Sequence, residues 1–318
     1  MMSGCLLMVL LAACTSSTPL LPTATISSPI YNLPTPTGED TPLEASTETT
    51  ETGPAPTSTR LPADFWQKLP AIPLEISDHM RELYHLGLAL GNNPHVFSRI
   101  GDCASAAPDF MVGFDGNYNL GAYTNLQPAI EYFKGSFQRP SLAAKNGLNS
   151  AGLLTTLWTG DQCLSKETLL DCQYRLDHPA FAIISVGTNE SYYVHHTPGA
   201  FETNMRAIIE DTMAKGIIPI LGTKADDIEG DNSINATIAR LALEYELPLW
   251  NFWQATHSLP NQGLADASHL SSVSYLNFTD FSIPHSLEYG MQVRNLTALE
   301  MLNFLREQLA EPFYTPSP

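Results

Sequence analysis

A cysteine, a histidine and an aspartate in this chain have the types and the spacing of a catalytic triad. Cys103 ends the tripeptide Gly101-Asp102-Cys103, and a cysteine sulfur can attack an ester carbonyl. His269 can act as the general base. Asp266, three residues earlier, can reach the far ring nitrogen within one tight turn and fix its tautomer. These residue types predict acyl transfer through a covalent intermediate.

The same chemistry needs hydrogen-bond donors for the oxyanion of the tetrahedral intermediate. We predict three of them, the backbone N–H groups of Cys103 and Gly152 and the side-chain amide of Asn189. Glycine leaves the backbone open to close approach, and an asparagine amide donates without adding charge. Asp102 is expected to have a structural role, holding the turn that carries the nucleophile.

These segments follow predicted strands. The strand His95–Ile100 precedes Cys103, and the continuous apolar run Phe181–Val186 precedes Asn189. Further strands are predicted at Ile217–Leu221 and Pro248–Phe252. They alternate with helices predicted at Thr124–Phe133, Ser165–Leu176, Ala200–Lys215, Asn232–Glu246 and Asn295–Leu309. Such alternation predicts an open parallel sheet with helices on both faces, and ligands of such folds bind beyond the carboxyl ends of the strands.

In their order, Gly101-Asp102-Cys103, Gly152, Gly187-Thr188-Asn189-Glu190 and Asp266-x-x-His269 resemble the four blocks of the SGNH (GDSL-type) hydrolases. The resemblance spans roughly residues 95–310. It implies an α/β fold, a flavodoxin-like three-layer α/β/α sandwich with a mainly parallel sheet, over the domain 62–318. It also implies an ester hydrolase or acyltransferase that uses no cofactor and no metal. Because the N-terminus predicts export, the expected substrates are extracytoplasmic small-molecule, glycan or lipid esters.

Cys103 stands where that family has its nucleophilic serine, which leaves two interpretations open. Cys103, His269 and Asp266 can form a Cys-His-Asp triad, in which the thiolate is favoured by a protonated His269. Alternatively, the chain has lost hydrolysis and is an inactive module that binds cell-envelope glycans. Ser105 is a weaker candidate nucleophile, because the family places the nucleophile directly after the aspartate. His285 is a rival base, without an aspartate three residues before it.

Three other features have a functional and a structural interpretation. The adjacent pair His195-His196 belongs to a substrate-facing loop or to a plain surface loop, and offers too few ligands for a metal site. The aromatic residues Trp250, Phe252 and Trp253 are expected in the core, although they could also stack on a sugar. An acidic stretch consists of Asp226, Asp227, Glu229 and Asp231. It is interpreted as a solvated loop or as a Ca²⁺ site without EF-hand spacing.

The N-terminus predicts export. The apolar run Cys5–Ala13 is too short to span a bilayer and fits the h-region of a signal peptide. Leu11-Ala12-Ala13-Cys14 resembles the lipobox of bacterial lipoproteins, which implies a signal peptide over 1–13 and lipid on Cys14. The alternatives are an ordinary cleavable signal or a buried apolar N-terminus. Residues 14–61, rich in Thr, Ser and Pro, predict a disordered tether to the outer face of the bacterial membrane.

Three cysteines then remain in the mature domain. Export favours disulfides, and Cys163 and Cys172 are close in sequence, so they are the expected pair. Cys103 is then a free thiol. The alternative is that Cys103 pairs with one of the others or is a buried, inert thiol.

The net charge of −18 argues against nucleic-acid partners, because such a surface repels phosphate backbones. The first 60 residues hold five acidic residues and one arginine, so most of this charge belongs to the domain. It suits neutral or cationic ligands, and it does not fix the oligomeric state.

Overall fold

The computed structural model describes residues 62–191, 197, 199–273 and 277–309. The predicted signal peptide and tether, and the pair His195-His196, lie outside these residues. In chain order the elements are η1 Phe65–Lys68, α1 Asp78–Leu90, β1 Asn93–Gly101, α2 Cys103–Ala106, η2 Val112–Asp115, η3 Thr124–Leu126, α3 Gln127–Tyr132, α4 Ser150–Leu153, α5 Leu169–Asp177, β2 Pro179–Ser185, α6 Ala200–Ala214, β3 Ile218–Gly222, α7 Ser233–Glu244, β4 Leu249–Trp250, α8 Phe252–Thr256, η4 Pro260–Gly263, η5 Ser286–Glu288 and α9 Gly290–Leu309.

The sheet has four strands, all parallel, in the order β1-β2-β3-β4. Every residue of β2 is buried, as expected for a central parallel strand covered on both faces. Gly101, the last residue of β1, also makes a parallel bridge to Ala144. Segments that follow β1 in the sequence therefore flank it on both sides, so the strand order reverses there. Such a reversal is the usual place of a ligand site.

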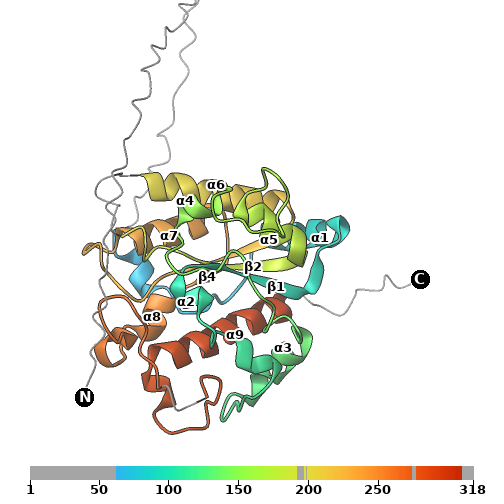
Figure 1. The fold of residues 1–318 in the computed structure, drawn as a ribbon. Coiled ribbons are helices and arrows are strands. Elements are labelled where there is room, and N and C mark those ends of the chain that lie inside the picture. The colour runs from blue at the N-terminus through green and yellow to red at the C-terminus, as the bar shows by residue number, and fades with distance from the viewer. Residues whose placement is uncertain (1–61, 192–196, 198, 274–276, 310–318) are drawn as a thin grey trace, which may run out of the picture. The chain divides into compact units, whose positions relative to one another are not determined.

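The two faces of the sheet are covered by different helices (Figure 1). Helices α5, α6 and α7 lie on one face, and α9 with α3 and α8 lies on the other. This is the predicted α/β/α sandwich with a parallel sheet, which is thereby confirmed. Within the part of the chain that the structure describes, no helix is both long and apolar enough to span a bilayer.

Two element boundaries differ from the prediction because side chains at these positions form other hydrogen bonds. The predicted strand Pro248–Phe252 is reduced to β4, because Asn251 leaves the sheet. The Asn251 side chain donates to the carbonyls of Trp66 and Leu69, and its backbone N–H to that of Ala71. The helix predicted from Ser165 begins at Leu169, where Thr168 Oγ1 accepts from Asp171 N–H at 3.1 Å.

The last helix, α9, begins at Gly290 rather than at the predicted Asn295, and most of its residues are buried. Its buried residues include Gln292, Arg294 and Asn295. Asn295 is buried because its side chain accepts from the N–H of Met111 and donates to the carbonyl of Asp109. The helix therefore carries polar groups into the core beneath β1.

Candidate active site

Cys103 lies where the sequence predicted, directly beyond the carboxyl end of β1. Asp102 caps the short helix α2, accepting from the N–H of Ala104 at 3.2 Å, which is the expected structural role. Cys103 is the first residue of that helix. It is half-buried and carries a free thiol.

Gly101 is required by the packing at this strand end. A Cβ built on it would overlap the backbone oxygen of Ser185 and the side chain of Ser105. Any other residue would push the end of β1 away from β2 or from α2. The glycine thus allows the turn with Cys103 to pack directly on the neighbouring strand.

His269 is oriented by Asp266, as the spacing predicted. Its Nδ1 lies 2.9 and 3.0 Å from the two carboxylate oxygens, and its backbone N–H donates to Oδ1 at 2.8 Å. The N–H of Ser268 donates to the same oxygen, and these hydrogen bonds lower the pKa of Asp266 to about 2. Because an ionised carboxylate only accepts, Nδ1 carries the proton and Nε2 remains for a nucleophile. Both side chains are exposed, at 65% for His269.

The sequence neighbours of Cys103 and His269 line one narrow cavity of about 20 Å³. Its lining includes Asp102 and Ala104 on one side and Ser268 and Leu270 on the other. Within the described ranges, no hydrogen bond joins Cys103 Sγ to His269. The structure therefore brings the two turns to a common cavity without closing the predicted contact between nucleophile and base. Catalytic hydrogen bonds are often long until a substrate is bound.

The other two predicted oxyanion donors are already engaged. The N–H of Gly152 donates to Asn149 Oδ1 at 2.9 Å, where Asn149 caps α4. The Asn189 side chain donates to the carbonyl of Leu148 at 2.8 Å, which leaves one of its two amide hydrogens. Gly152 is thus held by the cap of α4, and Asn189 is tied to the residue that precedes this cap, so their role as oxyanion donors stays a prediction.

Burial raises the pKa of the Cys103 thiol, and the charge of Asp102 adds to this shift. Burial also raises the pKa of Asp102, to about 6. Burial and the charge of Asp102 both favour the neutral thiol of Cys103 over its thiolate in this geometry. A reaction at Cys103 then needs a base to take its proton.

Arg294, which sequence reasoning missed, lies beneath this turn in the core. It is 1% exposed and donates to Ser105 Oγ at 3.2 Å and Ser185 Oγ at 3.1 Å. Its guanidinium lies 4.6 Å from the ring centroid of Phe110 and 4.8 Å from that of Trp250. Its charge opposes the rise in the pKa of Cys103. Arg294 lies among both polar and apolar residues of α9, so no local sequence signal singled it out.

The rival candidates have other partners. Ser105 is buried and its hydroxyl accepts from Arg294, which argues against Ser105 as the nucleophile. His285 does have a carboxylate, but it is Glu288, three residues after it and 2.6 Å away. In the acidic stretch, the solvated-loop interpretation is wrong for Asp226 and Glu229, which are buried beside Lys224.

The remaining structural predictions concern the core and the disulfide. Cys163 and Cys172 are bonded, which confirms the predicted pair and leaves Cys103 free. Trp250, Phe252 and Trp253 are buried, so their core interpretation is confirmed. Trp253 packs edge-on against Trp66.

Asp102→Asn is expected to flatten the dependence of stability on pH. The folded state holds the Asp102 proton up to about pH 6, whereas the ordinary pKa is 3.8. Unfolding therefore releases a proton between these values, and wild-type stability falls as pH rises through this window, by about 3 kcal/mol. The variant should lose this component while keeping the cap. Urea unfolding at pH 4, 5, 6 and 7 measures it, and identical curves for the two proteins would contradict it.

Comparison with known proteins gives fold-level likenesses only. No protein-family model matches the sequence, and no curated protein does. A catalytic mutant of an acetylxylan esterase from Geobacillus stearothermophilus is 14% identical with a TM-score of 0.42, over 67% of this chain and 96% of that one. A member of the lipolytic protein G-D-S-L family from Veillonella parvula DSM 2008 is 17% identical with a TM-score of 0.39, over 65% and 97%. Likenesses at this level carry no argument about chemistry.

Proposed function

We propose that the chain is an extracytoplasmic hydrolase or transferase of acyl esters, with Cys103 as nucleophile, His269 as base and Asp266 as its orienting group. One observation carries this proposal. Asp266 orients His269 so that Nε2 stays available. The two residues that flank His269 line the same cavity as the two residues that flank Cys103. This arrangement would provide a nucleophile at Cys103, an oriented base at His269 and a cavity beside them.

The proposed reaction has two steps. The Cys103 proton moves to His269 Nε2 as Sγ attacks the ester carbonyl carbon, and the tetrahedral oxyanion collapses to an acyl-thioester. His269 returns the proton to the departing alcohol. Water then attacks the thioester while His269 takes its proton, and the thiol leaves with that proton restored. The N–H of Cys103, the remaining amide hydrogen of Asn189 and the N–H of Gly152, once released by Asn149, are the proposed oxyanion donors.

The substrate class and the location are part of the proposal. The lipobox-like segment ending at Cys14 supports cleavage after residue 13, lipid attachment to Cys14 and a tether over 14–61. A domain held outside the membrane would meet glycan and lipid esters. The negative charge of the chain favours neutral esters over anionic ones.

A second candidate, an inactive module that binds envelope glycans, is favoured by two observations. Burial and Asp102 raise the pKa of Cys103. The N–H of Gly152 is held by Asn149 rather than facing a ligand. A site that keeps its nucleophile protonated and a donor occupied can retain binding without turnover.

Trapping the covalent intermediate separates the two candidates. After brief incubation with p-nitrophenyl acetate and acid quench, we expect intact mass to rise by one acetyl group, placed on Cys103 by peptide mapping. Cys103→Ala should show no adduct, and Cys103→Ser should form an oxygen ester at the same position. Steady release of p-nitrophenol by wild type and Cys103→Ala at equal rates would refute Cys103 as the nucleophile. Absence of adduct and of turnover in wild type would favour the binding module.

A further inference from the structure

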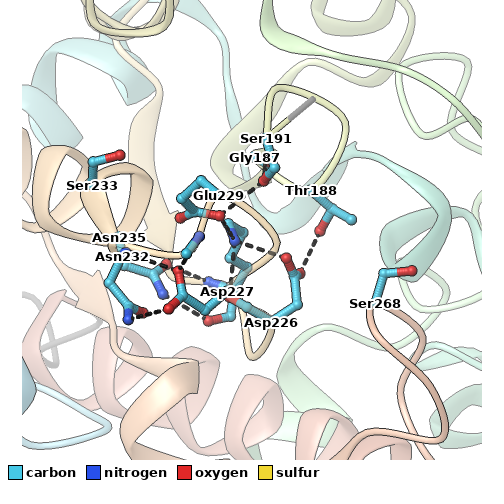
Figure 2. Close-up of polar contacts among 12 residues, drawn as sticks. Gly187, Thr188, Ser191, Asp226, Asp227, Glu229, Asn232, Ser233, Asn235 and Ser268 are labelled. Atoms are coloured by element: carbon cyan, nitrogen blue, oxygen red, sulfur yellow. Dashed lines mark hydrogen bonds and ion pairs between the residues drawn. The ribbon is translucent and has the colours of Figure 1, made fainter. Parts of the chain in front are cut away.

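The loop that carries Asn189 is held at both ends by a buried ionic network. On one side of Asn189, Thr188 Oγ1 donates to Asp226 Oδ2 at 2.8 Å. On the other side, Ser191 Oγ donates to Glu229 Oε2 at 3.0 Å. Figure 2 shows these two contacts reaching from the loop after β2 to the loop after β3. The two carboxylates thus fix the residues that flank Asn189.

Lys224 joins the two carboxylates. Its Nζ lies 2.7 Å from Asp226 Oδ1 and 2.6 Å from Glu229 Oε2, and it also donates to the carbonyl of Asp226 at 2.8 Å. The three side chains are 6%, 3% and 0% exposed. Two buried carboxylates without a cation would repel each other and would also lose their hydration, so their burial together would be unfavourable. The ammonium of Lys224 therefore lets both remain acceptors for the loop.

The stem of Lys224 also lies close to the start of the loop at Gly187. A Cβ built on Gly187 would lie 3.3 Å from Lys224 Cδ and 2.8 Å from Ile234 Cγ2. Gly187 has φ of +145°, so both its conformation and its surroundings favour glycine. The backbone of Lys224 is fixed in turn, since its N–H donates to Asn235 Oδ1 and its carbonyl accepts from Asn235 Nδ2. Gly187, at the start of the loop, thus lies beside Lys224, whose backbone is held by Asn235.

We propose that Lys224 is a positioning residue for Asn189, acting through Asp226 on Thr188 and through Glu229 on Ser191. This inference rests on the proposed function, because it assigns Asn189 the oxyanion. Lys224 and Asp226 line the cavity beside Asp102, so the network lies at the site rather than in a remote part of the core. A donor displaced by about 1 Å can cost on the order of 10²-fold in rate.

A double-mutant cycle between Lys224 and Asn189 tests the proposal. With p-nitrophenyl acetate, Lys224→Met should lower kcat by about 10- to 100-fold with little change in KM. In the Asn189→Ala background the same substitution should change kcat less than about twofold, because its effect passes through Asn189. Equal losses in both backgrounds would overturn the proposal, since they would indicate general damage. Lys215→Met is the matched control, because Lys215 also bridges two acids, Asp171 and Asp211.

Hydrogen exchange provides a readout that needs no activity. Lys224→Met should raise exchange in the peptide spanning 187–191 while β1 and α9 stay protected. Thr188→Val removes the hydrogen bond to Asp226 without removing a buried charge, so it tests the same loop if Lys224→Met does not fold. Unchanged exchange at 187–191 in the folded variants would overturn the proposal that Lys224 and the two carboxylates hold this loop. If wild type shows no turnover, the hydrolase proposal fails by itself, and exchange still decides whether Lys224 holds the loop.

Discussion

His269→Ala is expected to lower kcat for p-nitrophenyl acetate by about 10³-fold or more, while His285→Ala leaves it within about twofold. The Cys103 thiol has a raised pKa, so without a base it is a poor nucleophile. The sequence neighbours of His269, Ser268 and Leu270, line the cavity, whereas those of His285 do not. The two histidines form a matched pair, because both are exposed and both have a carboxylate partner at Nδ1.

Alkylation of Cys103 by iodoacetamide adds a second readout to this pair. His269→Ala should slow alkylation at pH 7, because the base no longer draws the proton from the thiol. Circular dichroism should show both variants folded, since each side chain is largely exposed. A larger loss of activity in His285→Ala than in His269→Ala would show that the base is assigned to the wrong residue.

Gly101→Ala is expected to destabilise the domain by about 3 kcal/mol and to abolish turnover. The new methyl group would meet the backbone oxygen of Ser185, which cannot move without parting β1 from β2. Gly160→Ala is the control, because no atom lies within 4 Å of a Cβ built there. It should change stability by less than about 0.5 kcal/mol. Thermal unfolding followed by circular dichroism compares the three proteins.

The two readouts of Gly101→Ala are informative together. If stability falls but p-nitrophenyl acetate turnover persists, the turn at Cys103 is not part of the reacting site. If the stability of Gly101→Ala matches that of Gly160→Ala, the close approach of β1 and β2 at Ser185 is wrong. Either result would remove the structural basis for placing Cys103 at this strand end.

The features that the sequence determined by itself depend on local patterns. The apolar run Phe181–Val186 marks β2, because a strand covered on both faces has no polar alternation. Asp266 and His269 meet because three residues in a turn bring a carboxylate within reach of Nδ1. Cys163 and Cys172 pair because a short loop brings them together and no nearer partner exists for either among the described residues.

Other features were decided only by the tertiary structure, because they depend on segments far apart in the sequence. The acidic stretch contains two buried anchors rather than a solvated loop, since Lys224 neutralises Asp226 and Glu229 where they meet Thr188 and Ser191. Arg294 reaches the nucleophile turn from a helix nearly 190 residues later, which no local pattern reveals. The pKa of Cys103 follows from desolvation and from Asp102, and desolvation exists only once the chain has folded around the thiol.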